Sequence, residues 1–204
     1  KAVGSGVYPI EAPSRTLATM LARSGGVSID PEIALVRVTR GSETGKVWLS
    51  DLYENPELDI ALRAGDKIVI EEDSRSFTAL GATGAQNLVP FSSETMSALE
   101  AIATVGGLLT SAANPKGVFI LRDESEEVAR AVTGRDDLVG PQRVVYVLNL
   151  VKPTGLFEAR DFMIRDGDTL YVTEAPFVRW QKILGAITGT ASSATTLATT
   201  ANGA

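Results

Sequence analysis

The chain has 204 residues, a formal net charge of −6 and 44% hydrophobic residues, which is enough apolar material for a proper core. It contains no Cys and no His, which excludes disulfides, thiolate metal sites and the Ser-His or Cys-His pairs of common hydrolases. Lys and Arg are scattered singly, so the clustered basic face that nucleic acid requires is missing, and no nucleic-acid partner is expected.

The first residues, KAVGSGVYPIE, resemble the interior of a domain rather than a beginning. No signal peptide opens the sequence, and no apolar run approaches the roughly 20 residues of a conventional membrane helix. We therefore expect an N-terminal portion to precede this sequence, and the missing signal says little about targeting.

The first predicted helix lies in SRTLATMLARSGG, where Leu17, Met20 and Leu21 share one face. Ser14 begins it and Gly25-Gly26 ends it. Strands follow in LVRVTR and VWLSDL. The GSETGKV between them has three residues between its glycines where a phosphate loop needs four, and it lacks the Ser or Thr of that loop, so a β-turn is favoured.

A Gly-Asp phrase then precedes an alternating strand in LRAGDKIVIEED. Gly65 permits a tight turn with positive φ, and Asp66 can bond nearby backbone amides. The phrase recurs a hundred residues later in IRDGDTLYV, with Gly167 and Asp168 in the same places. Both pairs are predicted to be structural turns before a closing strand.

The segments between the two phrases repeat the first plan in the same order. FTALGATGAQNLVPF is followed by a helix in SSETMSALEAIATVGG, with Met96, Leu99, Ile102 and Ala103 on one face and Ser92 or Ser93 as its cap. The double glycines match at an offset of 81, Arg40 matches Arg122 at 82, VWLSDL matches VYVLNL at 98, and the Gly-Asp pairs match at 102. Most of the increase in the offset between the two copies comes from an acidic insertion at 123–140, which we expect to project from the fold.

This pattern predicts a duplicated α+β domain, each copy with one helix on a small mixed sheet. The expected domains are residues 1–73, N-terminally incomplete because an opening strand is missing, and residues 77–175. A C-terminal segment, residues 176–204, follows them.

No catalytic residue, cofactor site or metal site is predicted. RDGD (165–168) lacks the further ligands of a calcium loop, and GATGAQ does not lead into a helix as a dinucleotide fingerprint does. No carboxylate pair stands out among the acids. Trp48 and Tyr146 match in the alignment and could stack on sugars, although core or interface packing is the simpler interpretation.

The C-terminal segment carries an apolar stripe at helical spacing, with Pro176 near the helix start and no charged side chain after Lys182. The stripe consists of Phe177, Trp180, Ile183, Leu184 and Ile187. Two interpretations stay open: an amphipathic helix that contacts membrane or neighbouring subunits, towards which we lean, or a short packing helix followed by a Thr/Ser/Ala-rich linker.

An ordered set of five features resembles the soluble-ligand-binding β-grasp (SLBB) module. They are a glycine-containing first strand, "P" plus an apolar residue, a short helix ending in "GG", a strand ending in Arg, and "GD" plus an apolar strand. Two such modules followed by an amphipathic tail resemble the outer-membrane polysaccharide export family of Gram-negative bacteria. The resemblance covers nearly the whole chain, but the family's N-terminal polysaccharide-export domain has no counterpart here.

The resemblance implies a non-enzymatic subunit of a translocon for capsular or exopolysaccharide in the periplasm and outer membrane. Its partners would be further copies in a homo-oligomeric ring, the polysaccharide, outer-membrane lipid and an inner-membrane co-polymerase, with the tails forming a transmembrane α-helical barrel. The alternative is a monomeric β-grasp module that captures a glycan or a cofactor without forming a pore.

Overall fold

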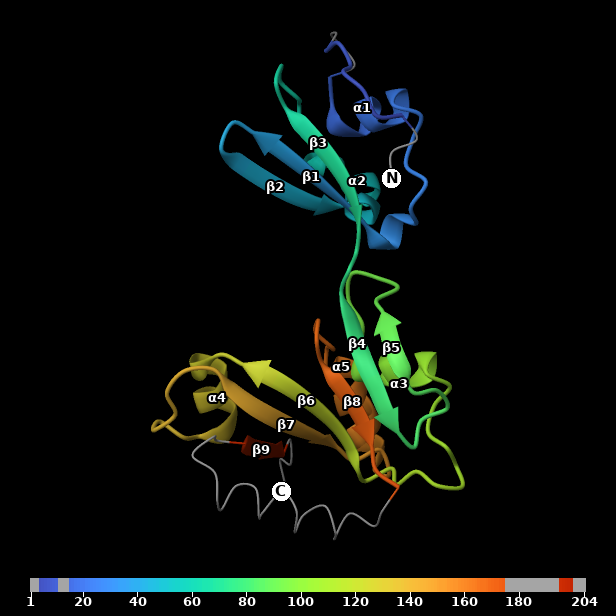
Figure 1. The fold of residues 1–204 in the computed structure, drawn as a ribbon, viewed down its shortest axis with the longest axis vertical. Coiled ribbons are helices and arrows are strands. Elements are labelled where there is room, and N and C mark those ends of the chain that lie inside the picture. Colours follow the sequence, from blue (N-terminus) through green and yellow to red (C-terminus); the bar gives the residue numbers. More distant parts are fainter. Residues whose placement is uncertain (1–3, 11–14, 175–194, 200–204) are drawn as a thin grey trace. The chain divides into compact units, whose positions relative to one another are not determined.

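The structure is a computed structural model, and it describes residues 4–10, 15–174 and 195–199, the last of these by its backbone alone. The chain divides into two compact units, one of residues 1–74 with 91–94 and one of residues 75–90 with 95–204 (Figure 1). Each unit combines helices with a β-sheet, which confirms the expected α+β class.

The first unit places its helices around a three-stranded sheet in the order β2-β1-β3, with both pairings antiparallel. Its elements are α1 (Leu17–Arg23), the 3-10 turn η1 (Pro31–Ile33), β1 (Ala34–Arg40), β2 (Glu43–Trp48), α2 (Leu49–Glu54), η2 (Pro56–Leu58) and β3 (Lys67–Glu72). The core joins α1 and α2 to one face of β1 through Leu17, Met20, Leu21, Val36, Leu49 and Leu52. The predicted apolar face of the first helix is therefore buried.

The second unit has a six-stranded mixed sheet in the order β5-β4-β8-β6-β7-β9. Its elements are β4 (Ser76–Gly81), β5 (Asn87–Pro90), α3 (Ala98–Thr104), β6 (Val118–Glu124), α4 (Glu126–Thr133), β7 (Gln142–Leu148), α5 (Pro153–Asp161), β8 (Thr169–Val172) and β9 (Thr195–Thr199). β4 pairs with β8 in parallel, and β7 pairs with β9 in parallel. The expected mixed sheet is thus found here, whereas the described strands of the first unit include no counterpart of β4 and form only antiparallel pairs.

Corresponding backbone contacts occur in both units. The amide of Leu17 donates to the carbonyl of Ile60, and the amide of Ala98 donates to the carbonyl of Phe162. Isolated bridges join Thr16 to Ala61 and Ser97 to Met163 in the same way. In both units, then, the start of the helix is fixed to the segment just before the Gly-Asp turn.

The strand pairing corrects the sequence alignment between the two hairpins. Val36 lies opposite Val47, and its counterpart Val118, 82 residues later, lies opposite Leu148, 101 residues after Val47. The offset therefore grows by 19 residues within the β6–β7 connection. The expected match of Trp48 with Tyr146 is wrong, because Tyr146 lies opposite Ile120 and thus corresponds to Gly45.

The helix of the second unit begins later than expected. Ser97, and neither Ser92 nor Ser93, is its N-cap, because Ser97 and Glu100 form a reciprocal capping box. The residues that α3 buries are Ala98, Ala101 and Ile102, whereas Ala103 is exposed. In the first unit Thr16 is the N-cap of α1, while Ser14 lies outside the described residues.

The insertion between β6 and β7 is a short helix that folds back on its own loop. Ser125 accepts a hydrogen bond from the amide of Val128 at the start of α4. Arg130 donates to the carbonyl of Leu138, and Glu126 accepts from the amide of Gly140 at 2.6 Å. Ala129 and Leu138 are buried, so the insertion is packed and not an open loop.

The tail is described only at Thr195–Thr199, which form β9 and not a helix. The expected C-terminal helix therefore does not extend through these residues. Their composition explains the difference, because β-branched Thr favours strands, and β7 offers five backbone positions for pairing.

Candidate functional site

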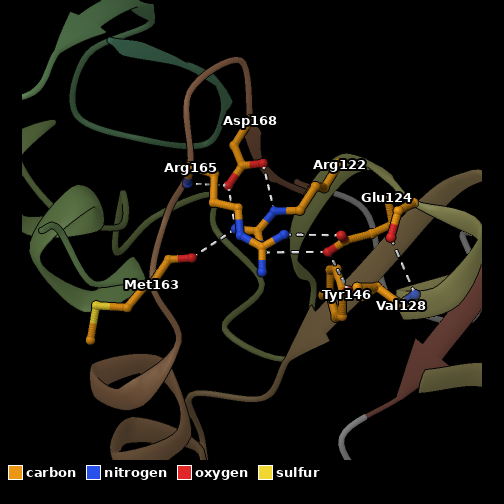
Figure 2. A network of polar contacts seen from close by, with 8 residues as sticks. Arg122, Glu124, Val128, Tyr146, Met163, Arg165 and Asp168 are labelled. Carbon is orange, nitrogen blue, oxygen red and sulfur yellow. Dashed lines mark hydrogen bonds and ion pairs between the residues drawn. The ribbon is translucent and has the colours of Figure 1, made fainter. Parts of the chain in front are cut away.

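The most distinctive polar arrangement is a buried cluster at the end of β6, where Arg122 and Glu124 come from the strand, Tyr146 from β7 and Asp168 from the Gly-Asp turn (Figure 2). Arg122 stands at a position whose neighbours along the strand, Val118 and Ile120, are fully buried. A buried guanidinium requires partners, and the cluster supplies them.

Arg122 binds Asp168 with both branches of its guanidinium. Its Nε donates to Oδ1 at 2.8 Å and its Nη2 donates to Oδ2 at 2.6 Å. Nη2 also donates to the carbonyl of Met163 at 2.7 Å. Because Asp168 accepts from the amide of Arg165 at 2.8 Å as well, this bidentate pair fixes the Gly-Asp turn to the end of β6.

Glu124 extends the cluster towards the insertion. Its Oε1 accepts from the Tyr146 hydroxyl at 2.8 Å, and its Oε2 accepts from Nη1 of Arg165 at 2.9 Å. Arg122 Nη1 lies 3.6 Å from Oε1 of Glu124. The rings of Tyr146 and Phe162 pack edge to face at 5.0 Å, and Arg122 lies 4.8 Å from the centre of the Phe162 ring. Each charge thus has an opposite charge beside it.

The surroundings shift two pKa values. Burial alone would lower the pKa of Arg122, but its hydrogen bonds to Asp168 and the charges of Asp168 and Glu124 outweigh burial and raise it. Burial, and then the hydrogen bond to Glu124, raises the pKa of Tyr146 to about 12. Arg122 stays charged and Tyr146 stays neutral at ordinary pH, so neither group is suited to proton transfer.

A simpler version of the same pair exists in the first unit. Arg40 donates from Nε and Nη2 to Asp66 at 2.9 and 2.7 Å, and also to the carbonyl of Ala61 at 3.1 Å. Asp66 accepts from the amide of Arg63 at 2.8 Å, and the hydrogen bond from Arg40 lowers its pKa to about 2. Gly65 and Gly167 both have positive φ, near 90° and 81°. In both units the Gly-Asp turn is therefore a fixed structural element.

Both carboxylates of the cluster accept from Arg or Tyr donors, so neither is a free base. In the described part of the chain no group of three or more acidic residues is placed to hold a metal ion. The described residues also include no helix that is both long and apolar enough to cross a membrane.

Sequence reasoning identified Arg122 and Asp168 separately but did not pair them. It considered Tyr146 for sugar stacking and Arg165 only within RDGD, and it did not single out Glu124. The available signal was a charged residue at a core position of an apolar strand. Tyr146 is buried with its hydroxyl bonded, so it has no free face for sugar stacking. The tail residues Phe177, Trp180, Ile183, Leu184 and Ile187 lie outside the described residues.

Residues 75–172, which make up most of the second unit, match the family model of the SLBB domain. The chain is 32% identical over 189 residues to the capsule polysaccharide export protein BexD of Haemophilus influenzae, covering 89% of this chain and 48% of that protein. It is 29% identical to the capsule polysaccharide export outer membrane protein CtrA of Neisseria meningitidis, covering 86% of this chain and 47% of that protein.

A further relative is the Vi polysaccharide export protein VexA/TviF of Salmonella typhi, 27% identical over 89% of this chain and 50% of that protein. The chain thus spans about half the length of the curated relatives that it matches. The match to the SLBB domain lies within the second unit, and the likeness to polysaccharide export proteins extends through the first unit as well.

Proposed function

We propose that this chain is part of a non-enzymatic subunit of a translocon that exports capsular or exopolysaccharide through the periplasm and outer membrane of a Gram-negative bacterium. The observation that carries the proposal is the similarity over 89% of the chain to a capsule polysaccharide export protein. Because that similarity includes both units, the proposal concerns the whole chain and not only its SLBB domain.

The first unit is, in this proposal, a second SLBB domain that lacks its opening strand. Support comes from the repeated ion pair, Arg40–Asp66 and Arg122–Asp168, and from the corresponding backbone bonds at the starts of α1 and α3. Residues 1–73 and 77–175 are thus two copies of one module, arranged in tandem.

Assembly into a homo-oligomeric ring is supported by exposed apolar side chains at corresponding places in the two units. In each unit they lie between the second strand of the hairpin and the Gly-Asp turn. They are Tyr53, Leu58 and Ile60 in the first unit, and Val151, Leu156, Phe157 and Met163 in the second. Exposed apolar residues that form a patch mark contact surfaces, and a repeated contact between identical copies closes into a ring when its rotation allows.

The tail stripe Phe177, Trp180, Ile183, Leu184 and Ile187 would make the contact with outer-membrane lipid and with neighbouring tails, as an α-helical barrel. The polysaccharide would pass through the ring as cargo, and an inner-membrane co-polymerase would deliver it. No cofactor or metal takes part in this proposal.

The test is the mass of the assembly with and without the tail. The full chain in mild detergent should form a defined oligomer by light scattering and a ring in projection images, whereas a variant lacking residues 176–204 should lose the oligomer or its binding to lipid. A full chain that stays monomeric, unchanged by the deletion, would instead favour the alternative, a monomeric β-grasp module that binds a glycan or cofactor.

A further inference from the structure

The sheet of the second unit has two apolar faces. Alternate residues of β4, β8, β6 and β7 point to the inner face and are buried with the helices: Phe77, Ala79, Val118, Ile120, Tyr146, Leu148, Leu170 and Val172. Contact between Tyr146 and Phe162, which ends α5, shows that this is the helix-covered face. The residues between them form the opposite face.

We define the outer face by its seven apolar residues, which the strand register places in two rows. They are Leu80, Leu88, Phe119, Leu121, Val145, Val147 and Tyr171. Leu88 is 65% exposed, Leu121 41% and Leu80 40%, whereas Phe119 and Val145 are buried. Most sheets with one helix-covered face carry polar residues on the other, so this face requires an explanation.

The first unit shows that the fold itself does not demand an apolar outer face. The positions corresponding to Phe119, Leu121, Val145 and Val147 are Arg37, Thr39, Thr44 and Lys46. Arg37 forms an ion pair with Glu71 at 2.6 Å on that face. The apolar outer face is thus a particular property of the second unit, the one that is followed by the tail.

The topology indicates which segment covers this face. β8 and β7 are both antiparallel to β6, and β9 is parallel to β7, so β8 and β9 run in the same direction within one sheet. Two parallel strands need a crossover connection of a dozen or more residues that returns across a face of the sheet. The connection here is residues 175–194, and the inner face already holds the helices.

We propose that the outer face is the docking surface for segment 175–194 of the same chain before assembly. The segment carries the apolar residues Phe177, Trp180, Ile183, Leu184 and Ile187, and its only charges are Arg179 and Lys182. It begins directly after β8, in the middle of the sheet, and ends at β9 on the sheet's edge. Docking covers the stripe and the exposed leucines together.

This inference deepens the proposed function and depends on it in one respect, namely that the same stripe later contacts membrane or neighbouring tails. A segment attached at both ends to the sheet meets the outer face at high effective concentration. Lipid or further copies would then have to compete with the outer face for the stripe. The docked arrangement keeps an apolar segment from aggregating in water.

The test uses tryptophan fluorescence, because the chain has only two tryptophans, Trp48 and Trp180. In the full chain with Trp48→Phe, Trp180 is the sole reporter of the segment. Acrylamide quenching in dilute, detergent-free solution should be weak. Replacing the three exposed leucines together (Leu80→Thr, Leu88→Thr, Leu121→Thr) should raise the quenching constant several-fold, towards its value in concentrated urea, and shift the emission to the red.

A matched control changes the corresponding face of the first unit, with Lys46→Thr and Val69→Thr, and should leave the quenching constant unchanged. Circular dichroism would establish that each variant is folded. A dilution series and light scattering would establish that the shielding belongs to single molecules. The inference is overturned if Trp180 is as accessible in the folded parent as in urea, or if the folded leucine variant shields it equally well.

Failure of this inference can be told from failure of the proposed function. A chain that assembles in detergent but exposes Trp180 as a monomer would contradict the docking alone. A chain that shields Trp180 but never assembles in detergent would contradict the export ring and leave the docking in place.

Discussion

Asp66 and Asp168 accept the same set of hydrogen bonds in different surroundings. Both accept two bonds from an arginine and one from the amide three residues earlier. Arg40 retains 35% of its side-chain exposure, whereas Arg122 retains 6%. Water can therefore solvate the charge of Arg40 in place of Asp66, but it can solvate the charge of Arg122 in place of Asp168 much less.

Replacing Asp168 by Asn should lower the free energy of unfolding of the second unit by about 3 kcal/mol or more, since Arg122 would keep its charge without its main partner. Asp161→Asn changes an exposed carboxylate in the same unit and should have little effect. Urea titration followed by circular dichroism would measure both. Equal stability of the two variants would show that the buried pair contributes no net stability.

The first unit should lose stability in acid through Asp66. Its folded-state pKa, about 2, lies below the ordinary value of 3.8, so the unfolded chain takes up this proton first. The stabilisation is present above about pH 4 and is lost as the pH falls towards 2. The difference in urea midpoint between the parent and Asp66→Asn, followed by Trp48 fluorescence in a Trp180→Phe background, should shrink over that range. A constant difference would contradict the assignment.

At the scale of elements, the two corresponding helices α1 and α3 are capped differently. Ser97 accepts from the amide of Glu100, and Glu100 accepts in return from the amide and the hydroxyl of Ser97, bonds that lower the pKa of Glu100. Thr16 makes no side-chain cap bond with α1. The α3 start is therefore fixed by its cap, and the α1 start depends more on packing.

Ser97→Ala should cost about 1 kcal/mol of unfolding free energy in the second unit, the usual contribution of an N-cap hydroxyl. Thr16→Ala is the natural control and should cost clearly less in the first unit. Thermal or urea unfolding would compare the two. A larger loss from Thr16→Ala would mean that the hydroxyl contact of Thr16 with Thr19 matters more than the capping box.

Helices, strands and turns were predictable where the same sequence pattern occurred in both halves of the chain. They were not predictable where a single residue determined the boundary of a helix. The Gly-Asp turns, the buried face of α1 and the two hairpins follow from spacing alone. The start of α3 was misplaced because three serines precede it, and only the reciprocal bond with Glu100 selects Ser97. The hairpin alignment was misplaced by three residues because VWLSDL and VYVLNL begin with Val and end with Leu alike, whereas the strand pairing sets an offset of 101.

The candidate cluster was the harder part to predict. Arg122 and Asp168 are 46 residues apart in sequence, and Glu124 appeared to be one acid among several in an exposed insertion. Its burial depends on Tyr146 and Arg165 arriving from β7 and from the turn. Such convergence is a property of the folded sheet, and no local pattern encodes it.

At the scale of the whole molecule, the two units have separate hydrophobic cores and separate ion pairs. Chains of this kind commonly depart from two-state unfolding. We expect two steps in urea, with Asp66→Asn moving one midpoint and Asp168→Asn moving the other. In the double variant the two losses should add, because the sites share no partner. One cooperative step moved by either change would contradict this expectation.

The folded-back helix between β6 and β7 has a practical consequence. Its ends are anchored by Glu126 and Arg130, while Arg135 donates to Asp137 at the exposed tip. An epitope exchanged for residues 134–137 should therefore be displayed without disturbing either strand. Antibody labelling of such a chain in intact and permeabilised cells would reveal on which side of the envelope this end of the module lies.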